Sequence, residues 1–381
     1  MAPEVGATEP LRLRVALVGC GRSSVDHVAT LTGLRHVEIV AVCDLDEKAA
    51  REAATRHGIR GCYTDAEVML RETRVDAVHL LTPPRSHLAL ARLGAKYGAH
   101  MYIEKPFAAT EAEGRAIVEL AREAGVQVCP GHNRLFDPVF VEACRRVRAG
   151  EIGRVISVRA EQGFTYEAAA RSTSIPWSYS YDWGTFDNLI SHPLYLVCHF
   201  LKDPGLPRVV GLNLGSIRDV GVEELRVLIP SSAGLGEVSF SLCSAPEVNR
   251  IEVLGTRGRV TADWQTMTVL TYRESELPSV LARFTENIAT ALDLIRSGTS
   301  TLLAIATGKV KRSQGLRTII EQFYQSLRDG MPAPVAPEQG VLNVRLLDQI
   351  KEACKPFRKQ RPELFIGRAP SLPVQEWGLT W

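Results

Sequence analysis

The sequence predicts an α/β fold in which a doubly wound domain precedes an α+β domain with a large, mainly antiparallel sheet. Three observations predict this fold. Short apolar runs alternate with helix-like segments before residue 130, a glycine-rich loop follows the first run, and later strands alternate apolar with polar residues. A chain of 381 residues is too long for one ordinary core, so two domains are expected.

Five apolar runs in the first third are expected to form a parallel sheet, because they are short, nearly continuous and rich in β-branched residues. They are residues 13–19, 37–44, 75–83, 100–105 and 126–130. Helices are expected between them at 46–58, 85–98 and 110–125. In the first of these helices, Asp46 can cap the first turn and Gly58 can end the last one.

The loop GCGRSS, residues 19–24, lies between the first strand and a helix-like segment. In that context a G-x-G-x-x-G fingerprint indicates dinucleotide binding. Gly19 is expected to make the tight turn, and Gly21 to let the backbone approach a pyrophosphate at the helix N-terminus. Ser24 stands at the third glycine position, where a small side chain is tolerable. The remaining loop residues expected to contact the cofactor are Cys20, Arg22 and Ser23.

Asp44 ends the second predicted strand, 25 residues after Gly19. A carboxylate at this position binds the 2′-hydroxyl of a ribose and repels a 2′-phosphate. The sequence therefore favours NAD over NADP, although Arg22 could still contact a phosphate.

The composition is that of a globular protein, with 45% hydrophobic and 23% charged residues and a net charge of +2. This charge is too weak to indicate a nucleic-acid or membrane partner, and no apolar run approaches the length of a transmembrane helix. The N-terminal segment lacks the apolar core of a secretion signal, so a cytoplasmic protein is expected. The eight cysteines form no C-x-x-C motif and do not cluster with histidine, so neither a metal site nor a disulfide framework is expected.

Two motifs lie at the predicted carboxyl ends of later strands, where sheets of this kind bind ligands. They are TPPRSH at 82–87 and EKP at 104–106. Pro106 restricts the backbone just after Lys105, so this lysine is expected to be held in place.

With these motifs the chain resembles the glucose–fructose oxidoreductase, inositol dehydrogenase and rhizopine-catabolism (Gfo/Idh/MocA) family. The resemblance extends over residues 11–355 and includes GHNRLFDPVF at 131–140 and NRIEVLGTRGRVTAD at 249–263. It implies a Rossmann domain at 11–130, a domain with an open-faced, mainly antiparallel sheet at 131–358, and a tail at 359–381. Val238, Phe240 and Leu242 agree with such a sheet, since alternate residues fall on one face.

The resemblance also implies hydride transfer between NAD, or possibly NADP, and a carbinol or carbonyl carbon of a sugar, sugar nucleotide, aminosugar or cyclitol. Lys105 would bind the reacting hydroxyl and stabilise its oxyanion, and His192 would be the acid/base. The family motif D-x-G-x-H-x-x-D is altered here, because Asn188, Ile190 and Tyr195 replace its first Asp, its Gly and its last Asp. Asn188 is expected to line the site and Asp187 to cap a helix.

Further cofactor contacts follow from the same resemblance, and they are Thr82, Pro83, His87, Glu104, Lys105 and Asn133. His27 is expected to be structural. The aromatic stretch at 164–183 can either contact substrate or simply pack. The resemblance implies a homodimer or homotetramer that acts on a small polyhydroxylated substrate.

Three alternatives remain open at this point. The chain could use a bound NAD for a net non-redox reaction. It could reduce an imine or enone in a biosynthetic pathway. It could also be a catalytically eroded regulator that binds NAD or a sugar, since Asn188 and Ile190 depart from the motif.

Overall fold

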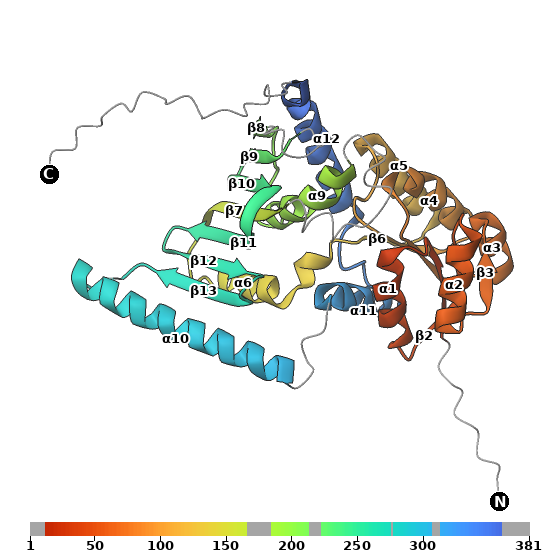
Figure 1. Cartoon of the computed structure of the whole chain (residues 1–381), viewed down its shortest axis with the longest axis horizontal. Helices are drawn as coiled ribbons and strands as arrows, with labels where there is room; N and C mark the ends of the chain where they lie inside the picture. Colours follow the sequence, from red (N-terminus) through yellow and green to blue (C-terminus); the bar gives the residue numbers. More distant parts are fainter. Residues whose placement is uncertain (1–11, 166–183, 213–221, 276, 307–312, 360–381) are drawn as a thin grey trace, which may run out of the picture.

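The computed structural model describes residues 12–165, 184–212, 222–275, 277–306 and 313–359. Within these residues the chain forms two sheets, each the centre of one domain (Figure 1). The predicted α/β class, with a parallel sheet followed by a mainly antiparallel one, is confirmed.

The first sheet has six parallel strands in the order β3-β2-β1-β4-β5-β6 among the described residues. Its strands are β1 (Leu13–Val18), β2 (Val37–Cys43), β3 (Gly61–Tyr63), β4 (Ala77–Leu80), β5 (His100–Ile103) and β6 (Val128–Pro130). The helices that connect them are α1 (Arg22–Thr32), α2 (Glu47–His57), α3 (Ala66–Thr73), α4 (His87–Lys96) and α5 (Glu111–Ala124). The strand order reverses direction beside β1, which is where ligands of such sheets bind.

The two capping residues predicted for the helix at 46–58 have the expected roles in α2. The Asp46 side chain accepts hydrogen bonds from the backbone N–H groups of Lys48 and Ala49, and Gly58 ends the helix in the left-handed conformation. The strand expected at 75–83 is shorter, because Pro83 and Pro84 start a 3-10 turn after β4. Both β3 and α3 were absent from the prediction, since a strand of three residues carries no measurable periodicity.

The second sheet has the order β13-β12-β11-β7-β10-β9-β8. Its strands are β7 (Val155–Thr165), β8 (Arg208–Leu212), β9 (Glu224–Ser231), β10 (Gly234–Ser241), β11 (Cys243–Gly255), β12 (Gly258–Asp263) and β13 (Thr268–Arg273). Neighbouring strands are antiparallel except for β7 and β10, which run parallel. Val238, Phe240 and Leu242 are all buried in its core, as their alternation predicts.

Helices cover one face of this sheet and connect it to the first domain. They are η2 (Asn133–Phe136), α6 (Pro138–Arg148), α9 (Gly184–Cys198), α10 (Ser279–Ala306), α11 (Gln314–Asp329) and α12 (Pro337–Lys359). Although α11 follows the second sheet in sequence, Phe323 and Tyr324 of α11 pack in the core of the first domain beside Val15 and Leu17 of β1. In α12, Val344 packs in the first domain and Leu347 in the second, so this helix joins the two cores. No helix of the described residues is long and apolar enough to cross a membrane.

Candidate active site

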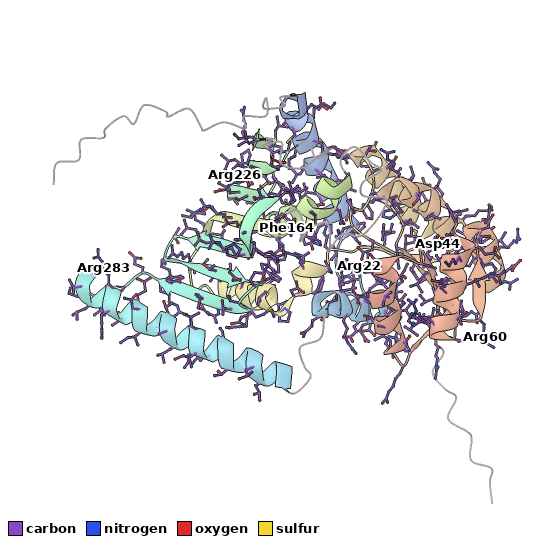
Figure 2. The ribbon with its side chains drawn as sticks, viewed as in Figure 1. Arg22, Asp44, Arg60, Phe164, Arg226 and Arg283 are labelled. Carbon is purple, nitrogen blue, oxygen red and sulfur yellow. The ribbon has the colours of Figure 1, made fainter. Side chains whose placement is uncertain are left out.

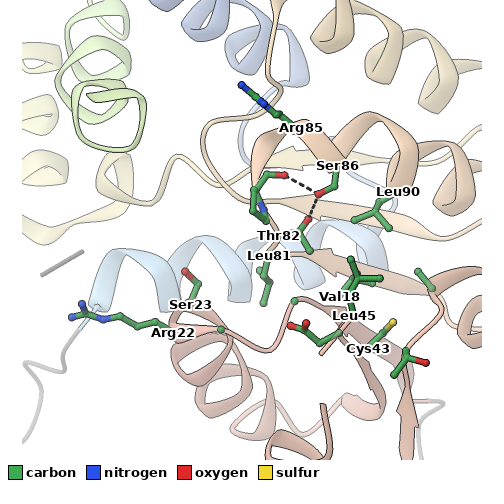
Figure 3. A pocket seen from close by; sticks show the side chains of 16 residues that line it. Val18, Arg22, Ser23, Cys43, Leu45, Leu81, Thr82, Arg85, Ser86 and Leu90 are labelled. Carbon is green, nitrogen blue, oxygen red and sulfur yellow. Dashed lines mark hydrogen bonds between the residues drawn. The ribbon is translucent and has the colours of Figure 1, made fainter. Parts of the chain in front are cut away.

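A pocket of about 650 Å³ opens at the carboxyl edge of the first sheet, around the loop between β1 and α1 (Figure 3). The predicted cofactor residues that line it are Gly19, Gly21, Arg22, Ser23, Asp44, Thr82 and Pro83. The pocket is also lined by Arg85 and Ser86 of the TPPRSH motif and by residues for which no role was expected, among them Leu45, Thr64, Ala66, Leu81 and Leu90. Most of these are small or apolar and follow other strands, so only the assembled sheet brings them to the pocket.

The glycines of the loop fit a dinucleotide. Gly19 has a φ of +101°, and a Cβ there would lie 2.9 Å from the carbonyl carbon of Leu81, so only glycine is accommodated. A Cβ on Gly21 would meet nothing within 4 Å, which leaves open space at the N-terminus of α1. The backbone N–H groups and the helix dipole at this terminus favour an anionic group such as a pyrophosphate.

Asp44 both shapes the loop and lines the pocket. One carboxylate oxygen accepts a hydrogen bond of 2.7 Å from the backbone N–H of Cys20, and the other accepts one of 3.0 Å from the backbone N–H of Asp46. The carboxylate therefore adds a negative charge to the wall of the pocket. The Ser86 hydroxyl, also in the wall, is hydrogen-bonded to the Thr82 hydroxyl over 2.7 Å and to the Pro83 carbonyl over 2.8 Å, and it fixes the opposite loop (Figure 3).

Six other predicted cofactor residues do not line this pocket: Cys20, Ser24, His87, Glu104, Lys105 and Asn133. The Ser24 hydroxyl instead donates to the Gly21 carbonyl, 2.6 Å away. His87 is buried, with its two ring nitrogens 2.8 Å from the Thr82 carbonyl and 3.2 Å from the Phe107 carbonyl. It therefore ties the loop after β4 to the segment after β5.

Lys105 and Asn188 meet between the two domains. The Lys105 ammonium donates to the backbone carbonyl of Asn188, 3.0 Å away, and also to its side-chain oxygen. Burial lowers the pKa of Lys105 to about 8, while the Glu104 carboxylate opposes this shift and Arg134 adds to it. Asn188, at the altered motif position, thus holds Lys105, whereas the His192 ring is hydrogen-bonded to Tyr195.

His192, one turn further along α9, is held by Tyr195. The Nδ1 atom of His192 lies 2.7 Å from the Tyr195 hydroxyl, which in turn lies 3.3 Å from the Asn133 side-chain oxygen. The backbone N–H of Arg134 donates to the same hydroxyl oxygen over 3.2 Å. If Tyr195 donates to Asn133, it accepts from Nδ1–H of His192, and the Nε2 atom of the ring is left with a lone pair.

The surroundings keep the His192 ring neutral. Burial, followed by the charges of Arg134 and Lys105, holds the pKa of His192 well below its usual range. A neutral imidazole whose Nε2 carries a lone pair can accept a proton from a substrate hydroxyl. The Asp187 side chain and the aromatic residues of 166–183 lie outside the described residues.

A buried chain of hydrogen bonds supports Glu104, the residue before the lysine. His27 Nε2 lies 3.1 Å from a Glu104 oxygen, His27 Nδ1 lies 2.8 Å from His79 Nδ1, and His79 Nε2 lies 2.8 Å from the Tyr324 hydroxyl. Because a carboxylate only accepts, His27 donates to Glu104, His79 donates to His27, and Tyr324 donates to His79. His27 was expected to be structural, and no role was expected for His79 or Tyr324.

We expect His27 to position Glu104 and thereby to raise the pKa of Lys105. Burial acts to raise the pKa of Glu104, but the His27 hydrogen bond and the Lys105 charge outweigh it and hold that pKa below its usual range. In His27→Gln, Glu104 should be held less firmly beside Lys105 and its charge should raise the lysine pKa less, so the alkaline limb of the pH–rate profile should move to lower pH. Tyr324→Phe, at the far end of the chain, is the control and should leave the limb in place. A rate that falls equally at every pH in His27→Gln would contradict this role.

Comparisons with known proteins agree with this geometry. The family described as "Oxidoreductase family, NAD-binding Rossmann fold" matches residues 13–132, and the "GFO/IDH/MocA C-terminal domain" matches residues 140–261. The chain is 27% identical over 339 residues to scyllo-inositol 2-dehydrogenase (NAD(+)) of Bacillus subtilis, with 84% of this chain and 96% of that protein covered. It is 37% identical to D-apiose dehydrogenase of Paraburkholderia graminis, but over only 37% of this chain and 38% of that protein.

Among solved structures, the fold is similar to that of the WlbA dehydrogenase from Bordetella pertussis, crystallised with NADH and UDP-GlcNAcA. The TM-score is 0.74 at 19% identity, and the match covers 92% of this chain and 97% of the other. At this identity the likeness shows the shared fold.

Proposed function

Because this chain belongs to the Gfo/Idh/MocA oxidoreductase family and has its NAD-binding Rossmann domain, we propose that it is a dehydrogenase or reductase. Its substrate would be a sugar, sugar nucleotide, aminosugar or cyclitol, and the reaction would occur at a CH–OH carbon. One observation carries the proposal. The half-buried Lys105 ammonium donates to the backbone carbonyl of Asn188, which lies one helical turn before His192 in α9, so an ammonium and an imidazole belong to the same site.

These two groups match the needs of alcohol oxidation. When bound, NAD would supply the hydride acceptor or donor. Lys105 is positioned by the Asn188 oxygens and by Glu104, so its ammonium can donate to the substrate oxygen and stabilise the negative charge that develops there. His192 can take the hydroxyl proton on Nε2, since Tyr195 occupies Nδ1. Carbonyl reduction runs these proton movements in reverse.

The altered motif changes how the histidine is supported. Tyr195 stands where the family motif has its last carboxylate, and a neutral hydroxyl stabilises an imidazolium less than a carboxylate does. Protonated His192 would therefore be a strong acid. A strong acid at this position would pass its proton on quickly, either to water after alcohol oxidation or to the substrate oxygen during carbonyl reduction.

The cofactor preference can be tested at Asp44. In Asp44→Asn the shape of the side chain remains, but the charge that would repel a 2′-phosphate is gone. We expect the ratio of kcat/KM for NAD+ to that for NADP+ to fall about 10- to 100-fold, equivalent to roughly 1.4–3 kcal/mol. Steady-state kinetics with both cofactors measure the ratio. Asp46→Asn is the matched control, because Asp46 caps α2 and does not line the pocket. An unchanged ratio would show that residues other than Asp44 determine the preference between NAD+ and NADP+.

The substrate class can be tested by a spectroscopic screen. Purified protein is incubated with NAD+ or NADP+ and with sugars, sugar nucleotides, aminosugars and cyclitols, and formation of the reduced nicotinamide is followed. Turnover with one of these classes is expected. A nicotinamide that co-purifies and never exchanges would instead favour a net non-redox reaction. Binding of NAD without any turnover, including with imines and enones, would favour a regulator.

A further inference from the structure

The long helix α10 packs on the rest of the protein through its polar side. It lies against β13, the edge strand of the second sheet, and its N-terminal end is the one remote from the first domain (Figure 1). The partly covered residues Ala282, Thr290 and Asp293 follow helical spacing and form one face. Asp293 on this face lies 3.5 Å from the guanidinium of Arg146 in α6. The side turned to the protein is thus small and polar.

The opposite side of α10 is an apolar stripe that faces outward. Leu281, Phe284, Ile288, Ile295 and Leu302 form this stripe, and they are 46% to 68% exposed. Figure 2 shows side chains of α10 that point away from the second sheet, with Arg283 near the end remote from the first domain. Single exposed leucines are ordinary on a protein surface, but a continuous apolar stripe of this length marks a contact surface.

We propose that a second copy of this chain covers the stripe, with the two α10 helices paired about a two-fold axis. The spacing of the stripe supports this partner. Leu281, Ile288, Ile295 and Leu302 recur every seven residues, which is the repeat by which two helices pack side by side. The charged residues of α10 are two arginines and two acids, so the helix lacks the basic polar face of helices that lie on membranes.

The stripe is also self-complementary. In an antiparallel pair centred between residues 289 and 290, Leu281 would lie opposite Gly298 of the second copy. Phe284 would then lie opposite Ile295, and Ile288 opposite Ala291, so that large residues face small ones at two of the three levels. A Cβ on Gly298 would meet nothing within 4 Å in one chain, so the space that a partner's leucine would need is open.

The helix is long enough to span an interface of ordinary width. α10 has 28 residues, which makes it about 42 Å long. Specific interfaces typically use about 20–30 residues and about 800 Å² on each side. A two-fold pair presents the same stripe twice, as isologous dimers do. This contact is separate from the pocket around the β1–α1 loop, because α10 packs on β13 of the second sheet, whereas the residues that line the pocket belong to the first domain (Figure 1).

The test compares molar masses of full-length variants by analytical ultracentrifugation. Ile288→Glu places a charge in the stripe. Leu294→Glu is the matched control on the same helix, because it lies off the stripe and is 45% exposed where Ile288 is 46% exposed. The wild-type protein should form an even-numbered oligomer, and Ile288→Glu should halve its mass. Leu294→Glu should keep the wild-type mass. Equal thermal unfolding midpoints for the two variants exclude misfolding as the cause.

A second variant separates a protein partner from a membrane. Gly298→Leu enlarges the apolar face, so a membrane-binding helix would bind more strongly, whereas a helix pair would lose its close approach. We expect Gly298→Leu to halve the mass and wild-type protein not to float with phosphatidylcholine–phosphatidylglycerol vesicles. A monomeric wild type, an unchanged mass in Ile288→Glu, or flotation that Gly298→Leu strengthens would each overturn the proposal.

Discussion

Replacing Lys105 by methionine should lower kcat/KM by about 10³-fold while NAD affinity stays within about twofold. Removing one preorganised donor to a developing oxyanion typically costs about 10²–10³ in rate, and here the donor also carries the charge. Methionine has a similar length and fills the buried space, so the fold should persist. The pocket of the β1–α1 loop does not include Lys105, which is why cofactor binding should survive. Single-turnover kinetics and a fluorescence titration with NADH measure the two quantities.

The control for this variant is Lys96→Met. Lys96 is exposed at the end of α4, pairs with Glu67 and does not line the pocket, so its loss should leave the rate unchanged. Near-wild-type turnover in Lys105→Met would remove the lysine from the mechanism. Equal loss of NAD affinity and rate would instead show that Lys105 acts through the cofactor.

The pH dependence follows from the same lysine. Because burial lowers the pKa of Lys105 to about 8, the ammonium is present below that pH and is lost as the pH rises through it. The rate of alcohol oxidation should therefore fall above about pH 8. In Asn188→Asp a carboxylate would stand beside the ammonium and raise its pKa, so this limb should move to higher pH.

Replacing His192 by alanine should lower kcat by about 10²–10⁴-fold, the usual contribution of a positioned acid/base group. Since the pKa of His192 is held well below its usual range, the wild-type rate should not show an acid limb between pH 6 and 8. Tyr195→Phe should lower kcat less, because the ring remains but its Nδ1 partner is lost and both tautomers become available.

Two controls distinguish chemistry from structure at His192. His57→Ala removes a histidine at the end of α2, away from the site, and should leave kcat unchanged. Exogenous imidazole should restore part of the rate in His192→Ala but not in Lys105→Met. If His192→Ala kept most of its turnover, His192 would be a substrate-positioning group and not the base.

The fold was predictable because its signals are local. The parallel strands are buried runs bounded by capping residues such as Asp46 and by glycines such as Gly58. The loop at Gly19 and the acid at Asp44 occur at fixed positions relative to β1 and β2, so they too are readable from spacing. In contrast, α11 follows the second sheet in sequence but packs in the first domain, which no local pattern reveals.

The site was predictable only in part. Lys105 was identified because EKP follows a strand at the ligand-binding edge of a sheet. Tyr195 was noted only as a departure from a motif, and its contact with His192 depends on one turn of α9. His27, His79 and Tyr324 come from α1, β4 and α11, and nothing in their separate surroundings indicates that they form one buried chain.

The sequence by itself determined the alternation of strands and helices in the first domain apart from β3 and α3, the glycine loop, the acid at the end of β2, and the motifs by which the family resemblance points to Lys105 and His192. Each of these depends on residues near one another along the chain, where periodicity and capping act. Only the tertiary structure decided that Asn188 binds Lys105, that Tyr195 holds His192, and that α10 turns its apolar side outward. Those outcomes depend on how segments distant in the sequence pack together and on which groups lose contact with water. Both are fixed only when the cores assemble.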